Sequence, residues 1–186
     1  TFASCTSLTS ITIPDSVTKI GDYPFHNCIS LQEFKGKFAS EDGRCLIIDG
    51  VLNSFAPAGL TEYTIPDGVT EIGEQAFRIC GLKNIAIPDS VTTIGRYAFG
   101  YCNSLINLTI PDSVTTIGNN AFYDCSSLTS ITIPDSVIEI GFATFALCEN
   151  LKTVYCKAIN PPTTIVNNNG YWYGFAMEDE SGIYDI

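Results

Sequence analysis

Positive charge is scarce in this sequence of 186 residues. It contains 9 Lys and Arg residues against 20 Asp and Glu residues, which gives a formal net charge of −11 at pH 7. Proteins that bind nucleic acid through its phosphates need a stripe of basic residues, and proteins that dock on anionic lipid need a basic patch. No apolar run approaches the roughly 18 residues that span a bilayer. We therefore expect neither a nucleic-acid partner nor membrane insertion in this segment.

Charged residues of both signs are few, at 16%, whereas hydrophobic residues make up 45%. A chain of this composition buries a core readily, so disorder is not expected. The first residue is Thr1 rather than Met, and no charged stretch followed by an apolar one opens the sequence. We interpret the chain as a processed product or an excised piece of a longer protein that has earlier repeats.

Repetition is what the sequence has in abundance. The motif Ile-Pro-Asp-Ser-Val, with Gly for Ser in one copy, occurs five times, starting at Ile13, Ile65, Ile87, Ile110 and Ile133. Each copy is followed by Ile-Gly and then by a Phe three residues before a Cys. The step from the Pro to that Cys is 14 residues in all five copies. Regular copies follow one another every 22 or 23 residues, and repeats of this length are typical of solenoids.

The repeat that starts at Cys125 shows what each unit predicts. Residues 131–133, Ile-Thr-Ile, alternate with the period of a half-buried strand. Pro134 has no N–H group and ends the strand. We expect Gly141 to supply a positive φ at the next corner. Residues 143–148 are then expected to form a short helical turn that ends at the next Cys.

A single unit is too small to fold alone. It buries about seven apolar side chains, worth on the order of 10–20 kcal/mol, whereas ordering its backbone costs roughly 1–2 kcal/mol per residue. Stacked units share their buried faces, which predicts a solenoid. Seven strand-like segments, spaced by about 4.8 Å, would give a parallel sheet roughly 29 Å along the stack. They begin at Leu8, Leu31, Leu60, Leu82, Leu105, Leu128 and Leu151.

The consensus Leu-x-x-Ile-x-Ile-Pro-Asp-Ser-Val-x-x-Ile-Gly-x-x-Ala-Phe-x-x-Cys resembles the BspA-like class of leucine-rich repeats. The resemblance covers about residues 1–157 and is closest over residues 60–151. It implies an α/β solenoid, a right-handed coil with a parallel β-sheet on one face and short helical turns opposite. It also implies a secreted or cell-surface protein of a host-associated bacterium. Some members of the class are implicated in adhesion to host or bacterial proteins, and no binding residues are defined for the class.

The pattern breaks between Cys28 and Cys80, which are 52 residues apart instead of 23. The extra segment contains Asp49-Gly50 between two apolar runs, a strong signal for a two-residue hairpin turn. We expect residues 37–58 to form a β-hairpin insertion in the solenoid. One alternative is a permuted repeat that keeps the stack continuous, and the other is a protrusion that contacts a ligand.

The repeat also stops near the C-terminal end, at Asn160-Pro161-Pro162. We therefore divide the chain into a solenoid, residues 1–157, and a C-terminal cap or tail, residues 158–186. Solenoid ends need a cap over the exposed core. The aromatic run 171–173, which contains Trp172, is expected to serve in that cap or to form a lip on which a carbohydrate or protein binds.

Eight Cys residues raise the question of disulfides or metal. Equivalent positions in stacked units lie about 5 Å apart, within reach of a bridge, but their side chains should all point into the core. We therefore expect free buried thiols that satisfy backbone groups at the corner of each repeat. No Cys-x-x-Cys pair is present, so a structural zinc site is not expected.

The sequence offers no evident set of catalytic residues. A nucleophilic Cys or Ser needs a base, and the only His is His26. This residue takes the position that Arg78 has in its own repeat, so we expect it to be exposed. No pair of carboxylates has a reason to act as an acid–base couple. We expect no enzyme and no cofactor.

The Asp residues of the repeated motif form a predicted column with spacings of about 5 Å. A column of carboxylates could bind Ca²⁺, which prefers oxygen ligands. Asp after Pro is also ordinary turn chemistry, because its side chain bonds nearby amides. We favour the turn and keep a weak candidate cation site at Asp67, Asp89, Asp112 and Asp135.

The outward strand positions are short, polar and nearly uncharged, which suits recognition of a polypeptide or a glycan through hydrogen bonds and shape. The alternative is a solvated face that is flat because its side chains are short. Our candidate ligand-binding residues are Thr64, Thr109, Thr132, Tyr155 and Trp172. The expected function is a non-catalytic interaction scaffold, extracellular or on the cell surface, that binds a host matrix or bacterial surface protein. The alternatives are a structural spacer or stalk and a glycan-binding module in nutrient capture.

Overall fold

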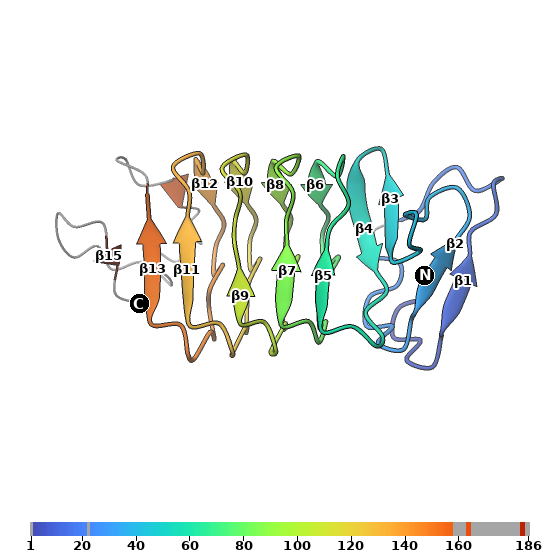
Figure 1. Cartoon of the computed structure of the whole chain (residues 1–186), viewed down its shortest axis with the longest axis horizontal. Helices are drawn as coiled ribbons and strands as arrows, with labels where there is room; N and C mark the ends of the chain where they lie inside the picture. Colours follow the sequence, from blue (N-terminus) through green and yellow to red (C-terminus); the bar gives the residue numbers. More distant parts are fainter. Residues whose placement is uncertain (1, 22, 158–162, 165–182, 185–186) are drawn as a thin grey trace.

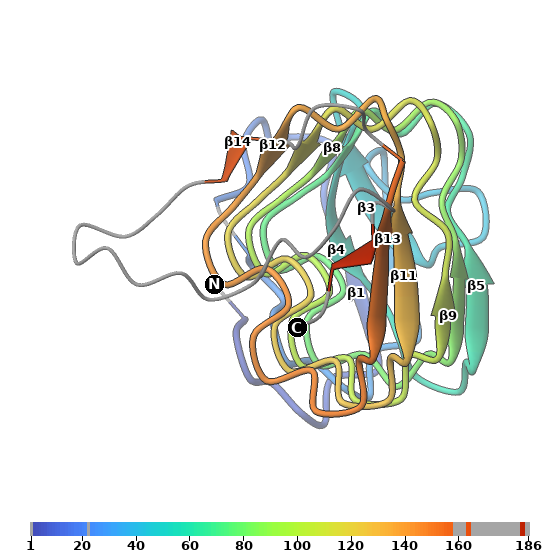
Figure 2. The ribbon, with the colours of Figure 1, turned by 90° about the vertical axis from the view of Figure 1, so that its left-hand side faces the viewer.

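A computed structural model describes residues 2–21, 23–157, 163–164 and 183–184. The chain is a right-handed β-solenoid of about six turns. Figure 1 shows the rungs, each formed by one repeat, stacked side by side along the long axis of the molecule. Viewed along that axis, each rung has three sides (Figure 2). Two sides carry strands and the third is made of turns.

The first side carries the seven strands that the repeat predicts. They begin two residues after the Leu residues named above. Most are parallel to their neighbours, but hydrogen-bond pairing divides the side into three short sheets: β1–β2, β5–β7–β9 and β11–β13–β15. The last of these ends in an antiparallel pair. The bounds of the seven are β1 Ser10–Thr12, β2 Glu33–Lys35, β5 Glu62–Thr64, β7 Asn84–Ala86, β9 Asn107–Leu108, β11 Ser130–Ile133 and β13 Thr153–Cys156, and the added antiparallel strand is β15 Ile183–Tyr184.

The second side carries a seven-stranded sheet that the sequence analysis did not predict. It follows the order β14-β12-β10-β8-β6-β4-β3, and most of its strands have two residues. In the rung that contains β10, Val114 and Ile117 of the Val-x-x-Ile segment are fully buried. The bounds are β3 Cys45–Ile48, β4 Val51–Phe55, β6 Glu71–Ile72, β8 Thr93–Ile94, β10 Thr116–Ile117, β12 Glu139–Ile140 and β14 Thr163–Thr164.

The third side, which we call the turn side, corrects the prediction of short helical turns. It consists of residues 21, 23–28, 73–80, 95–102, 118–125 and 141–148, and the described residues contain no helix. Backbone amides alternate between two acceptors. The amide of Phe77 donates to the carbonyl of Ala98 on the next rung at 2.8 Å, whereas that of Arg78 donates to Gln75 at 3.2 Å. A helix would point every amide along its own axis, so it cannot make the bonds between rungs.

The repeated Gly at the corner has a different role from the one predicted. Gly141 and Gly118 are absent from the residues with positive φ. At Gly118 a Cβ atom would lie 2.8 Å from the backbone nitrogen of Arg96 on the preceding rung. Glycine is therefore required because two backbones approach closely, not because the chain turns into the left-handed region.

In the interior, side chains at equivalent repeat positions lie above one another in columns. The rings of Phe77, Phe99, Phe122 and Phe145 follow one another with centroids 5.3–5.5 Å apart. Their interplanar angles of 6° to 20° make them stacked pairs, a favourable arrangement when the rings are offset. All four side chains are buried. A second, smaller core lies under the first rungs and includes Phe25, Leu31 and Phe34.

The irregular segment forms an antiparallel hairpin of β3 and β4 around Asp49 and Gly50. Both turn residues have positive φ, at 51° and 81°, as a two-residue hairpin turn requires. Strand β4 also pairs in parallel with β6, so the hairpin continues the second sheet. This pairing keeps the stack continuous, as one of the two alternatives requires; contact of the hairpin with a ligand stays a hypothesis.

Most of the predicted cap or tail, including Trp172, lies outside the described residues. Within it, β14 extends the second sheet by pairing with β12, and β15 pairs with β13. The boundary between the two predicted domains stays a prediction. Among the described residues there is no helix of the length and hydrophobicity that crossing a membrane requires.

Candidate interaction surfaces

The strand face is the outward row of the first side, at Thr12, Thr64, Ala86, Thr109, Thr132 and Tyr155. Thr64 pairs in register with Ala86, and Thr132 pairs with Tyr155. Thr64 and Thr109 are exposed, Thr132 is half-buried, and Tyr155 keeps 48% of its surface exposed. Strand alternation turns these side chains outward, since their neighbours Ile85 and Ile131 enter the core. The structure thus places four of the five candidate residues on one surface.

A second outward row runs beside the strand face and consists of Glu62, Asn84, Asn107, Ser130 and Thr153. Asn84 pairs in register with Asn107, and the Asn107 amide nitrogen donates to the Asn84 amide oxygen at 3.2 Å. Backbone amides within each sheet are used by strand pairing. A partner on this surface therefore meets short polar side chains and few charges, which provide hydrogen bonds and shape.

The Asp residues of the candidate cation site lie exposed in the turns after the motif Pro. The following Ser carries much of the local bonding: the hydroxyl of Ser113 donates to the Val91 carbonyl of the preceding rung at 2.6 Å. Ser90 and Ser136 make the same bond at 2.7 Å. Asp112 pairs with Lys157 at 3.6 Å. Within the described part of the chain, no three His, Cys, Asp or Glu side chains form a group that could hold a metal ion.

The repeated Cys side chains bond backbone groups, as expected for this corner. The thiols of Cys102, Cys125 and Cys148 donate to carbonyls of the preceding rung at 3.0–3.2 Å, and each acceptor is the Phe of that rung's Ala-Phe or equivalent segment. Burial raises the pKa of Cys102 well above its ordinary value and that of Cys45 to about 12. Burial therefore keeps the thiols of Cys45 and Cys102 in the neutral, less reactive form.

His26 is half-buried rather than exposed, which corrects the prediction. Its Nε2 atom accepts a hydrogen bond from Nη1 of Arg78 at 2.7 Å. The two residues are 52 positions apart and meet because the hairpin rung between them lacks the Ala-Phe-x-x-Cys segment. Burial, followed by the charge of Arg78, lowers the pKa of His26. The imidazole is thus held neutral beside the guanidinium.

The missing segment also leaves an open hollow on the turn side. Its walls come from residues 25–29, from the hairpin at Ser54, Phe55 and Pro57, and from residues 75–79. Polar side chains at its wall include Asn27, Gln75 and Arg78. The hollow exists because two turn segments face each other across a rung that has none.

The structure also gathers three tyrosines that the sequence analysis did not single out. The ring centroid of Tyr101 lies 6.3 Å from that of Tyr97 and 5.3 Å from that of Tyr123. The guanidinium of Arg78 lies over Tyr101 at 4.6 Å, and that of Arg96 over Tyr97 at 5.1 Å. We call these five residues, together with His26, the tyrosine–arginine row.

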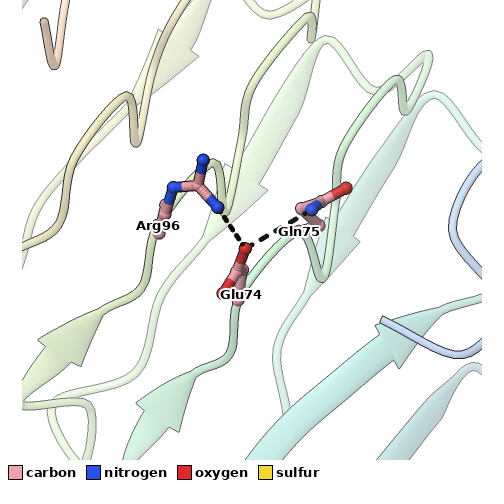
Figure 3. A network of polar contacts seen from close by, with 3 residues as sticks. All are labelled: Glu74, Gln75 and Arg96. Carbon is pink, nitrogen blue, oxygen red and sulfur yellow. Dashed lines mark hydrogen bonds and ion pairs between the residues drawn. The ribbon is translucent and has the colours of Figure 1, made fainter. Parts of the chain in front are cut away.

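Within this row, the charge of Arg96 is neutralised by an ion pair. Figure 3 shows its Nη1 atom bonded to a carboxylate oxygen of Glu74 at 2.8 Å, with the Gln75 amide near the same oxygen at 3.4 Å. A sequence signal for part of the row did exist, because Tyr97 and Tyr101 are four residues apart in one turn segment. Residues at this spacing share a face in a helix as well, whereas the contact of Tyr101 with Tyr123 joins two rungs and is not visible in a single repeat.

Comparisons with known proteins match the whole length of the repeat. The family described as BspA type leucine rich repeat region matches in six copies, over residues 1–40 and 52–170. The residues between these ranges contain β3 and the hairpin turn. None of the curated protein sequences compared with the chain matches it.

Three solved structures are similar to this chain. A leucine rich cell surface protein of Faecalibacterium prausnitzii is 27% identical, with a TM-score of 0.58 over 81% of this chain and 48% of that one. A leucine-rich repeat protein of Bacteroides capillosus is 36% identical, with a TM-score of 0.53 over 58% of this chain and 86% of that one. The pneumococcal vaccine antigen PcpA, at 19% identity and a TM-score of 0.64 over 82% and 46%, shares the fold.

The chain spans about half the length of the Faecalibacterium protein. The repeat motif, the right-handed coil and the six matched copies agree with one another, and they show that the chain belongs to the BspA-type leucine-rich repeat family.

Proposed function

We propose that this chain is a non-catalytic interaction segment of a bacterial cell-surface or secreted protein, and that it binds another protein through the strand face. The observation that carries the proposal is the alignment of Thr64, Thr109, Thr132 and Tyr155 on one surface of short polar side chains. The partner class that we favour is a host matrix protein or a bacterial surface protein. The similarity to a protein described as a leucine rich cell surface protein supports this location.

Recognition would be spread over several rungs. Protein–protein interfaces of ordinary size bury about 800 Å² on each partner, and adjacent strands are about 4.8 Å apart. A partner therefore has to contact several rungs, each contributing a few weak hydrogen bonds. Tyr155 is the exposed aromatic at the end of this row, and exposed aromatics are the usual anchors of such surfaces.

The test uses two variants on the strand face and one matched control. Thr109→Lys introduces a charge at the centre of the row, and Tyr155→Ala removes the anchor. Ile138→Lys introduces the same charge at a side chain that is 67% exposed next to β12 on the second side. Binding to an immobilised panel of collagen, laminin and fibronectin is measured by surface plasmon resonance.

We expect Thr109→Lys and Tyr155→Ala each to weaken binding by roughly tenfold or more, whereas Ile138→Lys should bind like the parent chain. Equal binding by all three variants would rule out the strand face. Failure of the parent chain to bind any protein on the panel would favour the spacer or stalk.

A further inference from the structure

The tyrosine–arginine row concentrates side chains that are rare in this chain. The chain has 9 Lys and Arg residues in all, and two of its three arginines and its only histidine lie in this row. Contacts run without interruption along the turn side. Tyr23 meets the edge of the His26 ring at 6.5 Å between centroids, His26 bonds Arg78, and Arg78 covers Tyr101. This side lies away from the strand face, on a different side of each rung (Figure 2).

The charge of the Arg78 guanidinium is available to a ligand. Among the described residues its guanidinium has no carboxylate within ion-pair distance, unlike Arg96, Lys35 and Lys157, each of which has one. One terminal nitrogen donates to neutral His26, and the plane lies against the Tyr101 ring. These two contacts fix the orientation of the guanidinium and leave its other donors free of a protein acceptor in the described structure. A fixed guanidinium binds a carboxylate through two parallel hydrogen bonds.

The hollow beside Arg78 is open to solvent and has polar walls. Asn27 and Gln75 line it together with Arg78; one amide N–H of Asn27 donates to Ser4 and one of Gln75 to Glu74, which leaves each amide nitrogen a second hydrogen for a ligand. From there the tyrosine rings extend along the turn side as an aromatic surface, with Tyr97 and Tyr123 half-buried around Tyr101. An anionic group and an adjoining apolar group therefore meet complementary chemistry at neighbouring positions.

We propose that the tyrosine–arginine row is a binding site for an acidic sugar, whose carboxylate binds Arg78 at the hollow and whose ring contacts the tyrosines that Tyr101 holds together beside it. The proposal stands independently of protein binding at the strand face. It differs from the glycan lip considered for residues 171–173, because it uses other residues on another part of the solenoid.

A saccharide fits this site better than a peptide. An extended peptide gains affinity by pairing with unpaired backbone groups. On the turn side the amides of Tyr97, Phe99 and Tyr101 already donate to the next rung, at 2.7–3.0 Å, and those between them donate within their own turn. Side chains are what remains available, and flat phenol rings with hydroxyl groups suit the apolar face and the hydroxyls of a sugar.

The negative charge of the whole chain does not prevent this binding. Interactions between exposed charges are screened beyond about 8 Å at physiological ionic strength. Close to the site, Arg96 neutralises Glu74, and Arg78 is a cation without a carboxylate at ion-pair distance among the described residues. The Asp124 carboxylate lies beside Tyr123, farther along the row. Attraction at contact distance therefore decides whether the anionic group binds.

Matched pairs of probes separate charge from sugar ring. The 186-residue chain is titrated by calorimetry or NMR with trigalacturonic acid and its methyl ester, and with 3′-sialyllactose and lactose. We expect at least one carboxylate form to bind at least tenfold more tightly than its neutral counterpart, and the difference to shrink as salt rises. A poly-glutamate peptide of the same net charge tests whether an acidic peptide is preferred.

Variants test the residues that carry the proposal. Arg78→Gln should weaken carboxylate binding by roughly tenfold to 100-fold, since it removes a charged hydrogen-bonding partner. Arg78→Lys keeps the charge but not the paired donors and should fall between. Tyr101→Leu should weaken both members of a probe pair. The control Lys83→Gln removes an exposed charge on the first side, next to β7, and should change nothing. Thermal melting verifies that each variant is folded.

Each outcome decides for or against the site. Tighter binding of a carboxylate probe that Arg78→Gln abolishes supports it. No binding of any saccharide probe, equal binding of acid and neutral forms, or unchanged binding by Arg78→Gln overturns it. Tighter binding of the peptide than of either acidic sugar overturns the assignment to a saccharide. Thr109→Lys, which tests the strand face, should leave the titration unchanged, so the two proposals can fail separately.

Discussion

At the scale of single residues, the repeated cysteine side chain links each rung to the preceding one by a hydrogen bond. The buried thiol is small and apolar enough for the core, and its weak S–H donor reaches the Phe carbonyl of the preceding rung. Six of the eight cysteines are buried, Cys5 is exposed and Cys156 is half-buried. Because burial also raises the pKa of Cys45 and Cys102, their reactive thiolate forms are disfavoured.

These environments predict how the thiols react with Ellman's reagent at pH 8. Cys5 should react at once, Cys156 more slowly, and the six buried thiols only as fast as the protein opens. Denaturant without reductant should release eight thiols for the eight cysteines of the sequence. A total of six or fewer would reveal disulfides and contradict the expectation of free thiols. The variant Cys5→Ser is the control, since it should remove the fast phase alone.

His26 shows why residue-level prediction had a limit. The repeat aligns it with Arg78, Tyr123 and Ala146, which are all half-buried, so the position itself is half-buried and the expectation of exposure was wrong. Its partner Arg78 is a neighbour in space only because the intervening rung lacks a turn segment. Periodicity predicts the environment of a residue inside regular rungs, but it cannot predict contacts created where a rung departs from the pattern. The tyrosine–arginine row begins at such a place.

At the scale of the elements, the corner glycine sets how closely two rungs approach. Replacing Gly118 by Ala places a methyl group 2.8 Å from the Arg96 backbone nitrogen, closer than carbon atoms normally come. Because that neighbour is backbone, relief requires the rungs to separate. We expect Gly118→Ala to lower the free energy of unfolding by about 1–3 kcal/mol, the usual cost of overpacking.

Urea denaturation monitored by circular dichroism measures this loss. The matched control is Gly81→Ala, because a Cβ atom there meets nothing within 4 Å and the backbone φ is not left-handed. Its effect should stay within about 0.5 kcal/mol. An equal effect of the two substitutions would mean that close approach of the rungs is not the reason for glycine at this corner.

The elements differ in how far the sequence predicts them. Strands of the first side are visible because Ile131-Thr132-Ile133 and its equivalents alternate over enough residues. Strands such as Thr116–Ile117 have two residues and show no alternation of their own. On the turn side, alternate amides donate to the next rung, so the predicted helix does not form. Such bonds between repeats cannot be predicted from the sequence of one repeat. Neighbouring rungs, rather than local preference, fix both elements.

At the scale of the whole molecule, the solenoid is not equally coupled along its length. Among the described residues, 2–21 and 23–35 take no part in the seven-stranded sheet, which begins at the hairpin. On the turn side, the hollow separates the first segments from residue 75 onward. Val17 and Ile20 are only half-buried, whereas their equivalents Val114 and Ile117 are fully buried. The first rungs are therefore joined to the rest mainly through the hairpin.

This unequal coupling predicts the order in which the chain opens. In a solenoid, stability is a sum of weak rungs and the interfaces between neighbours, so a rung with fewer interfaces opens at lower free energy. Native-state hydrogen exchange followed by mass spectrometry should show residues 2–35 opening first, by at least about 2 kcal/mol relative to residues 91–128. Peptides from the hairpin should lie between the two. Uniform protection from residue 2 to residue 157 would instead mean that the hairpin transmits the full coupling of a regular rung, and that the hollow is not a weak point in the stack.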